Sequence, residues 1–364
     1  MNEEVKNPQF KKSKPNKSSK KNIIIISVIA LVLIIGIVLF IVLSNKKESS
    51  SIDNTQKEET KEEIKPKLKI VNEDSKSRPY AVMINNHPTA RAYHHGLQDA
   101  YIIYEIIVEG GMTRYLALFK DQDTAKIGSV RSSRHYFLDY ALENDAYYVH
   151  WGWSPQAESD IRTLGINNIN GLTYEGTYFY RETFLVSLEH RGFTTMEMLK
   201  KATAKLNYRS ETNKDLLLNY SIDTQDLSQQ EEAKEANTVT IRYSNSITDK
   251  YVYDKENEYY LRYVNNSEHV DYATKEQYHF KNIITYQVAN SSISNDEKGR
   301  QDISNIGEGT GYYITNGYSI PIKWKKTSRE SQTKYYYTDG KELKVNDGNT
   351  FIQIQPKNET VSFE

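Results

Sequence analysis

The sequence predicts a mixed α+β or α/β fold, with an N-terminal membrane helix, an α/β ectodomain and a β-rich domain of hairpins. An uncharged apolar run occupies residues 23–43. From residue 79 onward, strand-like apolar runs alternate with amphipathic helical patterns, which is typical of α/β domains. From about residue 237, short alternating runs are separated by Asn, Asp and Gly, which predicts hairpins.

The N-terminus predicts a membrane anchor. Residues 1–21 carry seven lysines against Glu3 and Glu4, and the apolar run Ile23–Leu43 follows. At 1.5 Å per residue this run spans roughly 30 Å, the thickness of a bilayer core. A cleaved signal peptide is the alternative, but its apolar core is about 7–15 residues long and a small-residue cleavage site should follow. We therefore predict a signal-anchor helix at 22–43, with the basic tail 1–21 in the cytoplasm and the ectodomain outside.

The composition of the chain excludes several classes of function and predicts a linker after the apolar run. Residues 44–78 are rich in Lys, Glu and Ser and have few apolar residues, so we expect a disordered linker there. The net charge of −1 gives no basic footprint for nucleic acid. Because the chain has no cysteine, it can have no disulfide, thiol nucleophile, thiolate zinc site or lipidated cysteine. We expect no cofactor.

The first domain is predicted for residues 79–225. YAVMIN (80–85) is a short apolar run before a polar turn, as in a buried strand. Residues 101–108 and 113–120 predict an antiparallel hairpin after a short helical turn, because Gly110-Gly111 can adopt the positive φ of a tight turn. A continuous helix through 101–108 is the alternative.

Helices and one further strand complete this domain. Residues 132–145 show an apolar helical stripe that Ser132 or Ser133 can cap. AYYVHWG (146–152) predicts a strand. Ser154-Pro155 then begins a helix that ends at Gly165, and another helix is expected over 194–206.

The second domain is predicted for residues 237–356. TVTIRYS, KYVYD, EYYLRYV and the later tyrosine-rich runs alternate as strands do. YYYTDGKEL includes an Asp339-Gly340 turn. The acidic and polar stretch 223–236 is the expected boundary between the two domains.

Histidines form the first polar cluster. INNHPTARAYHHG contains His87, His94 and His95, and imidazole is a common zinc ligand. The spacing matches no helix-face motif such as H-E-x-x-H. We predict histidines in a surface loop and no metal site.

EIIVEGGMTR forms the second cluster. In a strand, Glu105 shares a largely apolar face with Ile103 and Ile107, so it must be paired or neutral. We expect Arg114 to reach Glu109 or Glu105 as an internal ion pair. This pair has either a structural role or a role in binding a polar ligand or in acid–base chemistry.

Two further motifs suggest ligand contacts. GSVRSSR (128–134) places Arg131 and Arg134 at an expected helix N-terminus, where backbone N–H groups and guanidinium groups favour an anion. Surface arginines beside a helix cap are the alternative. HWGWSP (150–155) places His150 and two tryptophans at a strand end, where ligands often bind in α/β domains. The tryptophans could stack on a sugar ring, whereas Ser154 is better explained as a helix cap.

These motifs together resemble a known family. RPYAVMINNHPTARAYHHGLQDAYIIYEIIVEGGMTRYLALF, followed by KIGSVRSSRHYFLDYALENDAYYVHWGWSP, resembles the YerB-like family of bacterial envelope proteins. GYYITNGYSIPIKWKK, YYYTDGKEL and NTFIQI resemble its second half, so the resemblance covers about 79–356. Members often look like lipoproteins, whereas this chain has an apolar helix and no cysteine. His94 and His95 stand where the family pattern has no histidine, and Ala92 replaces its proline. The resemblance implies a two-part domain of unknown function.

We expect a non-enzymatic, membrane-anchored protein that binds peptidoglycan, another wall component or an envelope protein. One alternative is a wall-polymer hydrolase or transferase that uses Glu105 or Glu109 with His87 or His150 and an arginine clamp. Another is a structural subunit of a membrane complex. The ligand-binding candidates are Asn86, His87, Arg91, Glu105, Glu109, Arg114, Arg131, Arg134, His150 and Trp153. A ligand site requires that three loops meet: the turn with Asn86, His87 and Arg91, the segment VEGGMTR (108–114) and the segment VRSSR (130–134).

Overall fold

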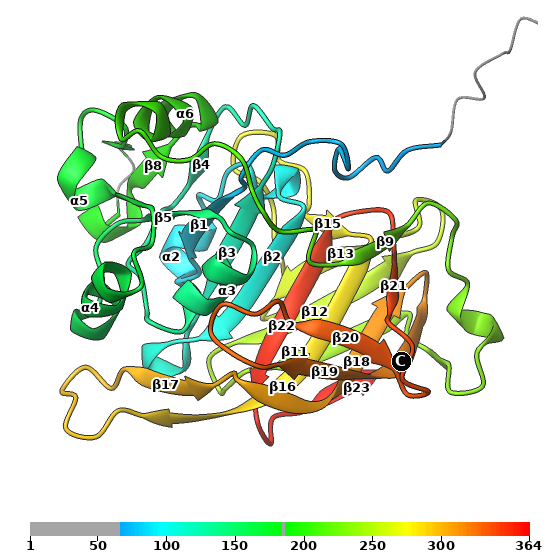
Figure 1. Ribbon diagram of the computed structural model, residues 1–364. Coiled ribbons are helices and arrows are strands. Elements are labelled where there is room, and N and C mark those ends of the chain that lie inside the picture. Colours follow the sequence, from blue (N-terminus) through cyan, green and yellow to red (C-terminus); the bar gives the residue numbers. More distant parts are fainter. Residues whose placement is uncertain (1–65, 184–185) are drawn as a thin grey trace, which may run out of the picture. The chain divides into compact units, whose positions relative to one another are not determined.

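The computed structural model describes residues 66–183 and 186–364, in which strands predominate (Figure 1). The predicted tail 1–21 and membrane helix 22–43 lie outside the described residues. No helix within the described ranges is long and apolar enough to cross a membrane.

A twelve-stranded mixed sheet contains strands from both halves of the sequence. Its strands are joined in the order β10-β19-β18-β16-β22-β2-β3-β1-β5-β6, with β17 and β20 paired at the side. The halves meet where β2 (Ile102–Ile107) runs parallel to β22 (Thr350–Pro356), with Glu105 opposite Gln353. The short edge strand β6 (Asn168–Asn170) comes from the first half. The other strands from the second half are β10 (Lys234–Glu235), β16 (Asn282–Ser292), β17 (Gln301–Ser304), β18 (Gly307–Thr315), β19 (Tyr318–Lys326) and β20 (Lys334–Tyr337).

The first half contributes the central strands. β1 (Tyr80–Asn85) is antiparallel to β3 (Thr113–Phe119) and parallel to β5 (Tyr147–His150). All residues of these strands are buried, as their apolar sequences predict. The predicted hairpin is confirmed: β2 and β3 are joined by the short 3-10 turn η2 (Glu109–Gly111), in which both glycines have φ of 68°.

Helices α4, α5 and α6 lie beside the β5 edge of the large sheet (Figure 1), and α6 packs against β6. Ser154 caps α4 by accepting a 3.3 Å hydrogen bond from the Ala157 N–H, as predicted. The predicted caps Ser132 and Ser133 are wrong, because α3 begins only at Phe137. Ser133 instead accepts the Tyr148 hydroxyl at 2.7 Å. The helices are α2 (Pro88–Arg91), α3 (Phe137–Glu143), α4 (Pro155–Thr163), α5 (Gly171–Tyr174), α6 (Met196–Lys205), η1 (Leu97–Asp99), η3 (Leu188–His190) and η4 (Leu227–Gln229).

A second, six-stranded sheet packs against the large one. The Tyr243 hydroxyl of this layer donates to the Glu105 carbonyl in β2 at 2.9 Å, and Tyr251 packs edge-on against Phe351 in β22. Its strands are β11 (Thr238–Arg242), β12 (Thr248–Asp254), β13 (Tyr259–Val264), β14 (Ser267–Glu268), β15 (His279–Phe280) and β23 (Val361–Phe363). Two small sheets pair β9 (Asn219–Ser221) with β21 (Lys344–Asn346), and β4 (Ile127–Gly128) with β8 (Gly192–Thr194) and β7 (Tyr180–Arg181).

Two predicted boundaries differ from the structure. Residues 66–78, assigned to the disordered linker, are packed on the fold: Leu68 and Val71 are buried, and Arg78 donates to the Asp145 carbonyl at 2.8 Å. The lysines around these apolar residues concealed them in the composition. The expected boundary 223–236 is part of the same unit, because β10 pairs with β19.

Candidate functional site

Three loops meet at one cationic pocket of about 450 Å³, which we call the arginine pocket. It brings together six of the ten predicted site residues, and the second half of the chain adds two cations. Its lining residues are Asn85, His87, Val108, Glu109, Met112, Thr113, Arg114, Arg131, Ser132, Arg134, Trp153, His190, Lys298 and Arg300.

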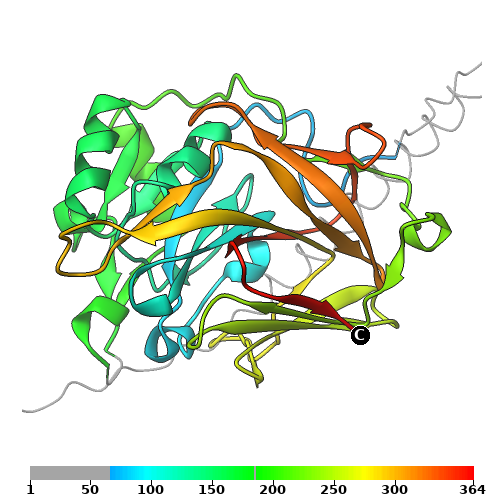
Figure 2. The same ribbon diagram turned by 90° about the horizontal axis from the view of Figure 1, so that it is seen from below.

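Each loop is held by the strands it follows. Glu109 lies in the β2–β3 turn and Arg114 at the start of β3. The Arg131–Arg134 segment is held beside β1 and β5 by the Arg131 N–H, which donates to the Met83 carbonyl at 2.9 Å, and by a bridge between Ser133 and Trp153. The β16–β17 hairpin extends beneath the helices (Figures 1 and 2) and brings Lys298 and Arg300 to the pocket.

Positive charge is in excess in this pocket. Five lining side chains are cationic (Arg114, Arg131, Arg134, Lys298, Arg300) and only Glu109 is a carboxylate. Glu109 accepts from Nε of Arg134 with both oxygens, at 2.9 and 3.0 Å. Burial opposes ionisation of Glu109, but the Arg134 hydrogen bonds and the nearby positive charges outweigh it and lower its pKa. Glu109 is thus neutralised by Arg134, and Arg300 pairs with Asp296 at 2.6 Å, so the excess positive charge comes from Arg114, Arg131 and Lys298.

Arg114 and Arg131 have no carboxylate partner among the described residues. Arg114 is buried and donates from Nη1 to the Ser132 carbonyl. Burial, with the charge of Arg134, lowers the pKa of Arg114 to about 9. Burial also lowers the pKa of Arg131, whose Nη1 reaches only the Glu189 carbonyl, at 3.4 Å. The pocket is therefore unfavourable for these two cations unless an anion joins them.

Two histidines form one wall. His87 caps α2, and its ring stacks on His190 with the ring centroids 4.8 Å apart. Nδ1 of His190 lies 2.8 Å from Nδ2 of Asn85. Burial and the neighbouring His87 lower the pKa of His190. The lowered pKa favours the neutral imidazole of His190, which can donate and accept hydrogen bonds.

A second pocket of about 450 Å³, which we call the tryptophan pocket, adjoins the first. The two pockets share Arg131, Ser132 and Trp153. Its other lining residues are Val130, Trp151, Gly152, Leu172, Arg181, Leu188, Glu189 and Gly192.

Three of the predicted residues belong to a different cluster. Glu105 is fully buried and lies 2.8 Å from Nη2 of Arg262, which also holds Asp249 at 2.7 Å. Asn86 donates to Glu105 at 3.1 Å and accepts from Nε of Arg91 at 2.8 Å. We call Glu105, Asp249 and Arg262 the buried triad. Asn86, Arg91 and Glu105 therefore stabilise the contact between the two sheets and do not line the arginine pocket.

His150 is close to the arginine pocket but sealed from it. It is fully buried, and its ring packs on Trp153 at 5.4 Å. Nδ1 of His150 donates to the Gly152 carbonyl at 2.8 Å, and burial lowers the pKa of the ring. His150 therefore supports Trp153 from behind.

The prediction of His94 and His95 as surface histidines is wrong, since both are buried. Nε2 of His94 lies 2.6 Å from the Asn85 carbonyl, and Nδ1 lies 2.8 Å from Nε2 of His269. These histidines are buried because the segment after β14 covers their loop: His269 contacts His94, and the Tyr272 N–H donates to the His94 carbonyl at 2.8 Å. The described residues contain no group of three His, Asp or Glu side chains suited to a metal.

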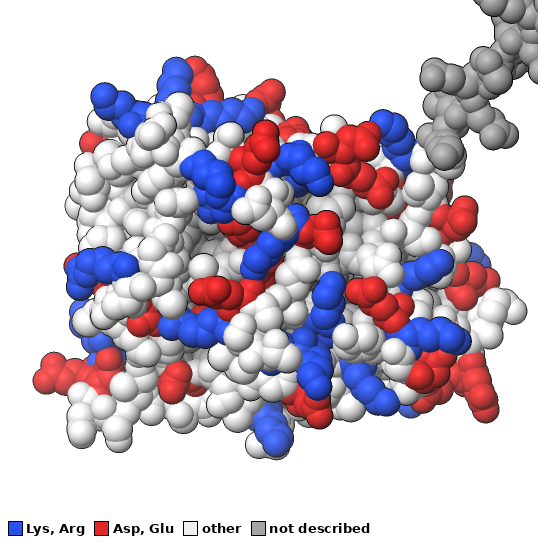
Figure 3. Space-filling view, in the orientation of Figure 1, with Lys and Arg blue, Asp and Glu red and all other residues white. Residues whose placement is uncertain are grey.

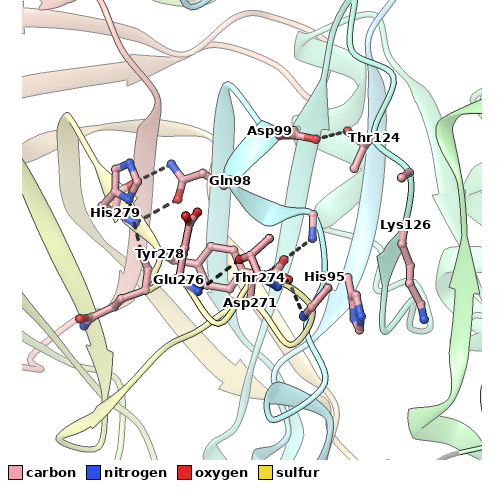
Figure 4. A pocket seen from close by; sticks show the side chains of 14 residues that line it. His95, Gln98, Asp99, Thr124, Lys126, Asp271, Thr274, Glu276, Tyr278 and His279 are labelled. Atoms are coloured by element: carbon pink, nitrogen blue, oxygen red, sulfur yellow. Dashed lines mark hydrogen bonds between the residues drawn. The ribbon is translucent and has the colours of Figure 1, made fainter.

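A further pocket, of about 300 Å³, lies beside His95 (Figure 4). Asp271 in this pocket accepts from the N–H of Gly96 at 2.8 Å and from the Tyr278 hydroxyl at 2.9 Å. Gln98 donates to the His279 carbonyl at 2.9 Å. These polar groups are hydrogen-bonded to one another, and two of the bonds join residues 96–98 to residues 271–279. The pocket therefore lies where the two halves of the sequence are held together.

Two predicted contacts also differ from the structure. Arg114 was expected to pair with Glu109 or Glu105, but Arg134 and Arg262 take those carboxylates. A helix N-terminus was expected to offer backbone N–H groups at Arg131–Arg134. The N–H groups of Arg131 and Ser133 are instead used by the Met83 and Gly152 carbonyls, so an anion would be held by side chains.

Several lining residues belong to no motif that points to a site. Lys298 and Arg300 occur in NDEKGR, an ordinary polar turn almost 170 residues after Arg131. His190, Leu172 and Leu188 stand in no motif. Trp151 was within HWGWSP, and the two-tryptophan pattern was its only indication.

Comparison with known proteins gives matches for both halves. The family models described as "Protein of unknown function (DUF3048) N-terminal domain" and "C-terminal domain" match residues 67–209 and 239–352. A Bacillus subtilis (strain 168) protein named "Putative lipoprotein YerB" is 33% identical over 293 residues, which cover 79% of this chain and 84% of that protein. The crystal structure of the YerB protein from Bacillus subtilis has a TM-score of 0.69 at 30% identity, and the match covers 79% of this chain and 94% of that one.

Proposed function

The chain belongs to the YerB-like family of two-part DUF3048 domains, and from this premise we propose that it is an envelope-anchored binding protein whose arginine pocket holds an anionic group. The relative is named as a lipoprotein, which is a membrane-attached class. This chain has no cysteine for a lipid, and its apolar run 23–43 supplies the anchor instead. The ligand is then a wall component or an envelope protein that reaches the ectodomain.

The unpaired Arg114 carries the proposal. A guanidinium group that is 7% exposed normally has a carboxylate partner. Here it faces Arg131 and Arg134, and the one available carboxylate is held by Arg134. A carboxylate or phosphate that enters the pocket would supply the missing charge, and guanidinium groups bind both in a bidentate manner.

Binding is better supported than catalysis. A hydrolase or transferase needs a proton donor or acceptor exposed to its substrate. Glu105 and His150 are fully buried, outside the pocket. Glu109 is in the pocket, but Arg134 holds it in the ionised form, which makes it a poor acid. Of the remaining lining groups, His87 caps α2 and His190 is hydrogen-bonded to Asn85, while the cations are suited to holding a negative charge.

The charge is local to the pocket. On the face drawn in Figure 3, blue Lys and Arg side chains are interspersed with red Asp and Glu side chains. Such a mixed surface does not favour long polyanions. A small anionic group in a concave site fits this distribution better.

Thermal unfolding in the presence of anions tests the proposal. The full-length chain in phosphatidylcholine nanodiscs is titrated with sodium phosphate and sodium acetate at constant ionic strength. We expect the Tm to rise with either anion, because a ligand that binds only the folded state adds about 2.7 kcal/mol at 100 times its Kd. Arg131→Gln and Arg114→Gln should abolish most of the rise.

Arg162→Gln is the matched control, because Arg162 is exposed on α4 and does not line the pocket. Its response should equal that of the wild type. Sedimentation with purified cell-wall sacculi provides a second measurement, in which wild type and Arg162→Gln are retained and Arg131→Ala is not. An anion response that survives in both pocket variants would contradict the site.

A further inference from the structure

We propose that the arginine and tryptophan pockets form one groove that binds a peptide carboxylate with an aliphatic side chain next to it. This inference rests on the proposed function and names the ligand class of the same site. Arg131 is central to it, because its side chain lines both pockets. An anion bound beside Arg131 is therefore adjacent to the tryptophan pocket.

Two exposed leucines in the tryptophan pocket make it suitable for an apolar group. Only five large hydrophobic side chains are exposed among the described residues, and two of them, Leu172 (61%) and Leu188 (60%), line this pocket. Exposed leucines that flank one concavity indicate a missing apolar partner. An aliphatic side chain placed between them would remove apolar surface from water on both sides.

The aromatic floor of this pocket is rigid. The Trp151 ring lies against Gly171 and Gly192, where a Cβ atom would come within 2.4 and 2.5 Å of it. Phe179 packs edge-on against the ring at 5.4 Å, and the Arg181 guanidinium lies 4.4 Å from the ring centroid. Because these contacts hold the Trp151 ring in place, a bound side chain does not have to pay the entropic cost of ordering it.

A peptide fits the remaining groups better than a lipid does. Each pocket has about 450 Å³, enough for one or two residues. Glu189 at the rim accepts peptide N–H groups but repels a phosphate. Arg114 and Arg131 provide forks for a planar carboxylate.

Titration with four small probes tests the ligand class. The probes are N-acetyl-Gly-Leu, N-acetyl-Gly-Gly, N-acetyl-Gly-Leu-amide and inorganic phosphate, and the readouts are calorimetry and tryptophan fluorescence of the full-length chain in nanodiscs. We expect N-acetyl-Gly-Leu to bind about tenfold more tightly than N-acetyl-Gly-Gly, the gain from burying a leucine side chain. The amide should not bind, because it has no carboxylate.

Two variants separate the two ends of the groove. Leu172→Ser with Leu188→Ser should make the two dipeptides bind equally and leave N-acetyl-Gly-Gly unchanged. Arg131→Gln should weaken both. Ile222→Ser is the matched control, because Ile222 is an exposed apolar residue outside the groove.

The outcomes distinguish this inference from the proposed function. Equal binding of both dipeptides by the wild type, or phosphate as the tightest probe, overturns the peptide assignment and leaves an anion site dependent on Arg131. Failure of every anion to bind at about 10 mM, a range that detects even millimolar Kd values, overturns both.

Discussion

The Glu105 carboxylate lies 2.8 Å from Nη2 of Arg262, and both side chains have no exposed surface. Glu105 comes from β2 and Arg262 from β13, so this contact joins the two sheets and the two halves of the sequence. The same nitrogen binds Asp249 at 2.7 Å. Burial and the charge of Asp249 raise the pKa of Glu105. One guanidinium group thus serves two carboxylates, and the interface depends on it.

Arg262→Met should be strongly destabilising. The substitution keeps most of the volume but leaves Glu105 and Asp249 facing each other without a cation. We expect a loss of about 3–5 kcal/mol in the free energy of unfolding, measured by urea denaturation of the full-length chain. Adding Glu105→Gln and Asp249→Asn should restore a large part of the loss. Equal stability of Arg262→Met and wild type would show that the triad is not structurally important.

Stability should fall as the pH decreases below about 6.5. Burial lowers the pKa of His94 to about 3, and also lowers those of His269 and His150. Above pH 6.5 these rings are neutral in the folded and in the unfolded chain. Below pH 6.5 the histidines of the unfolded chain become protonated, while the buried rings of the folded chain stay neutral. Each net proton costs about 1.4 kcal/mol per pH unit.

Glu105 acts in the opposite direction on this pH profile. Its raised pKa means that the folded state holds a proton that the unfolded chain releases above about pH 4.5. Its contribution is largest at low pH and is lost as the pH rises. Three histidines outweigh one carboxylate, so urea unfolding between pH 7.5 and 5 should still show a net loss. A His94→Gln variant should show a smaller slope, and a flat wild-type profile would contradict neutral buried histidines.

Arg131→Gln should separate stability from binding. Removing one positive charge relieves repulsion with Arg134, which contributes to the lowered pKa of Arg131. We expect the free energy of unfolding to stay constant or to increase by up to about 1 kcal/mol, while anion binding is lost. Urea denaturation without added anion is the measurement, with Arg162→Gln alongside. A large loss of stability would indicate a structural role for Arg131.

Gly192→Ala should disturb the floor of the tryptophan pocket. A Cβ atom at this position would lie 2.5 Å from the Trp151 ring and force the ring to move. We expect a loss of about 1–3 kcal/mol, typical of overpacking, together with a changed tryptophan emission spectrum. Gly340→Ala is a comparison, because its Cβ meets no atom and its cost arises only from the φ of 90°. Stability equal to wild type with unchanged emission would show that Trp151 is not fixed.

Local patterns in the sequence were sufficient for much of the secondary structure. The Gly110-Gly111 hairpin, the Ser154 cap and strands such as YAVMIN depend on residues close together in the chain, and all three are confirmed. The motif order also identified the family. These features follow from backbone preferences and apolar periodicity, which neighbouring residues determine.

The tertiary structure decided which polar residues meet. Glu105 was expected beside Arg114, yet its partner Arg262 lies 157 residues away. Arg131 and Arg300 line the same pocket because the β16–β17 hairpin returns to the first half of the sheet. Such contacts depend on the order of strands in the sheet, to which no local pattern refers. Local sequence patterns determined strands such as YAVMIN and identified the family. Only the packing of the two sheets determined that Glu105 joins a buried triad while six of the predicted residues line a separate arginine pocket.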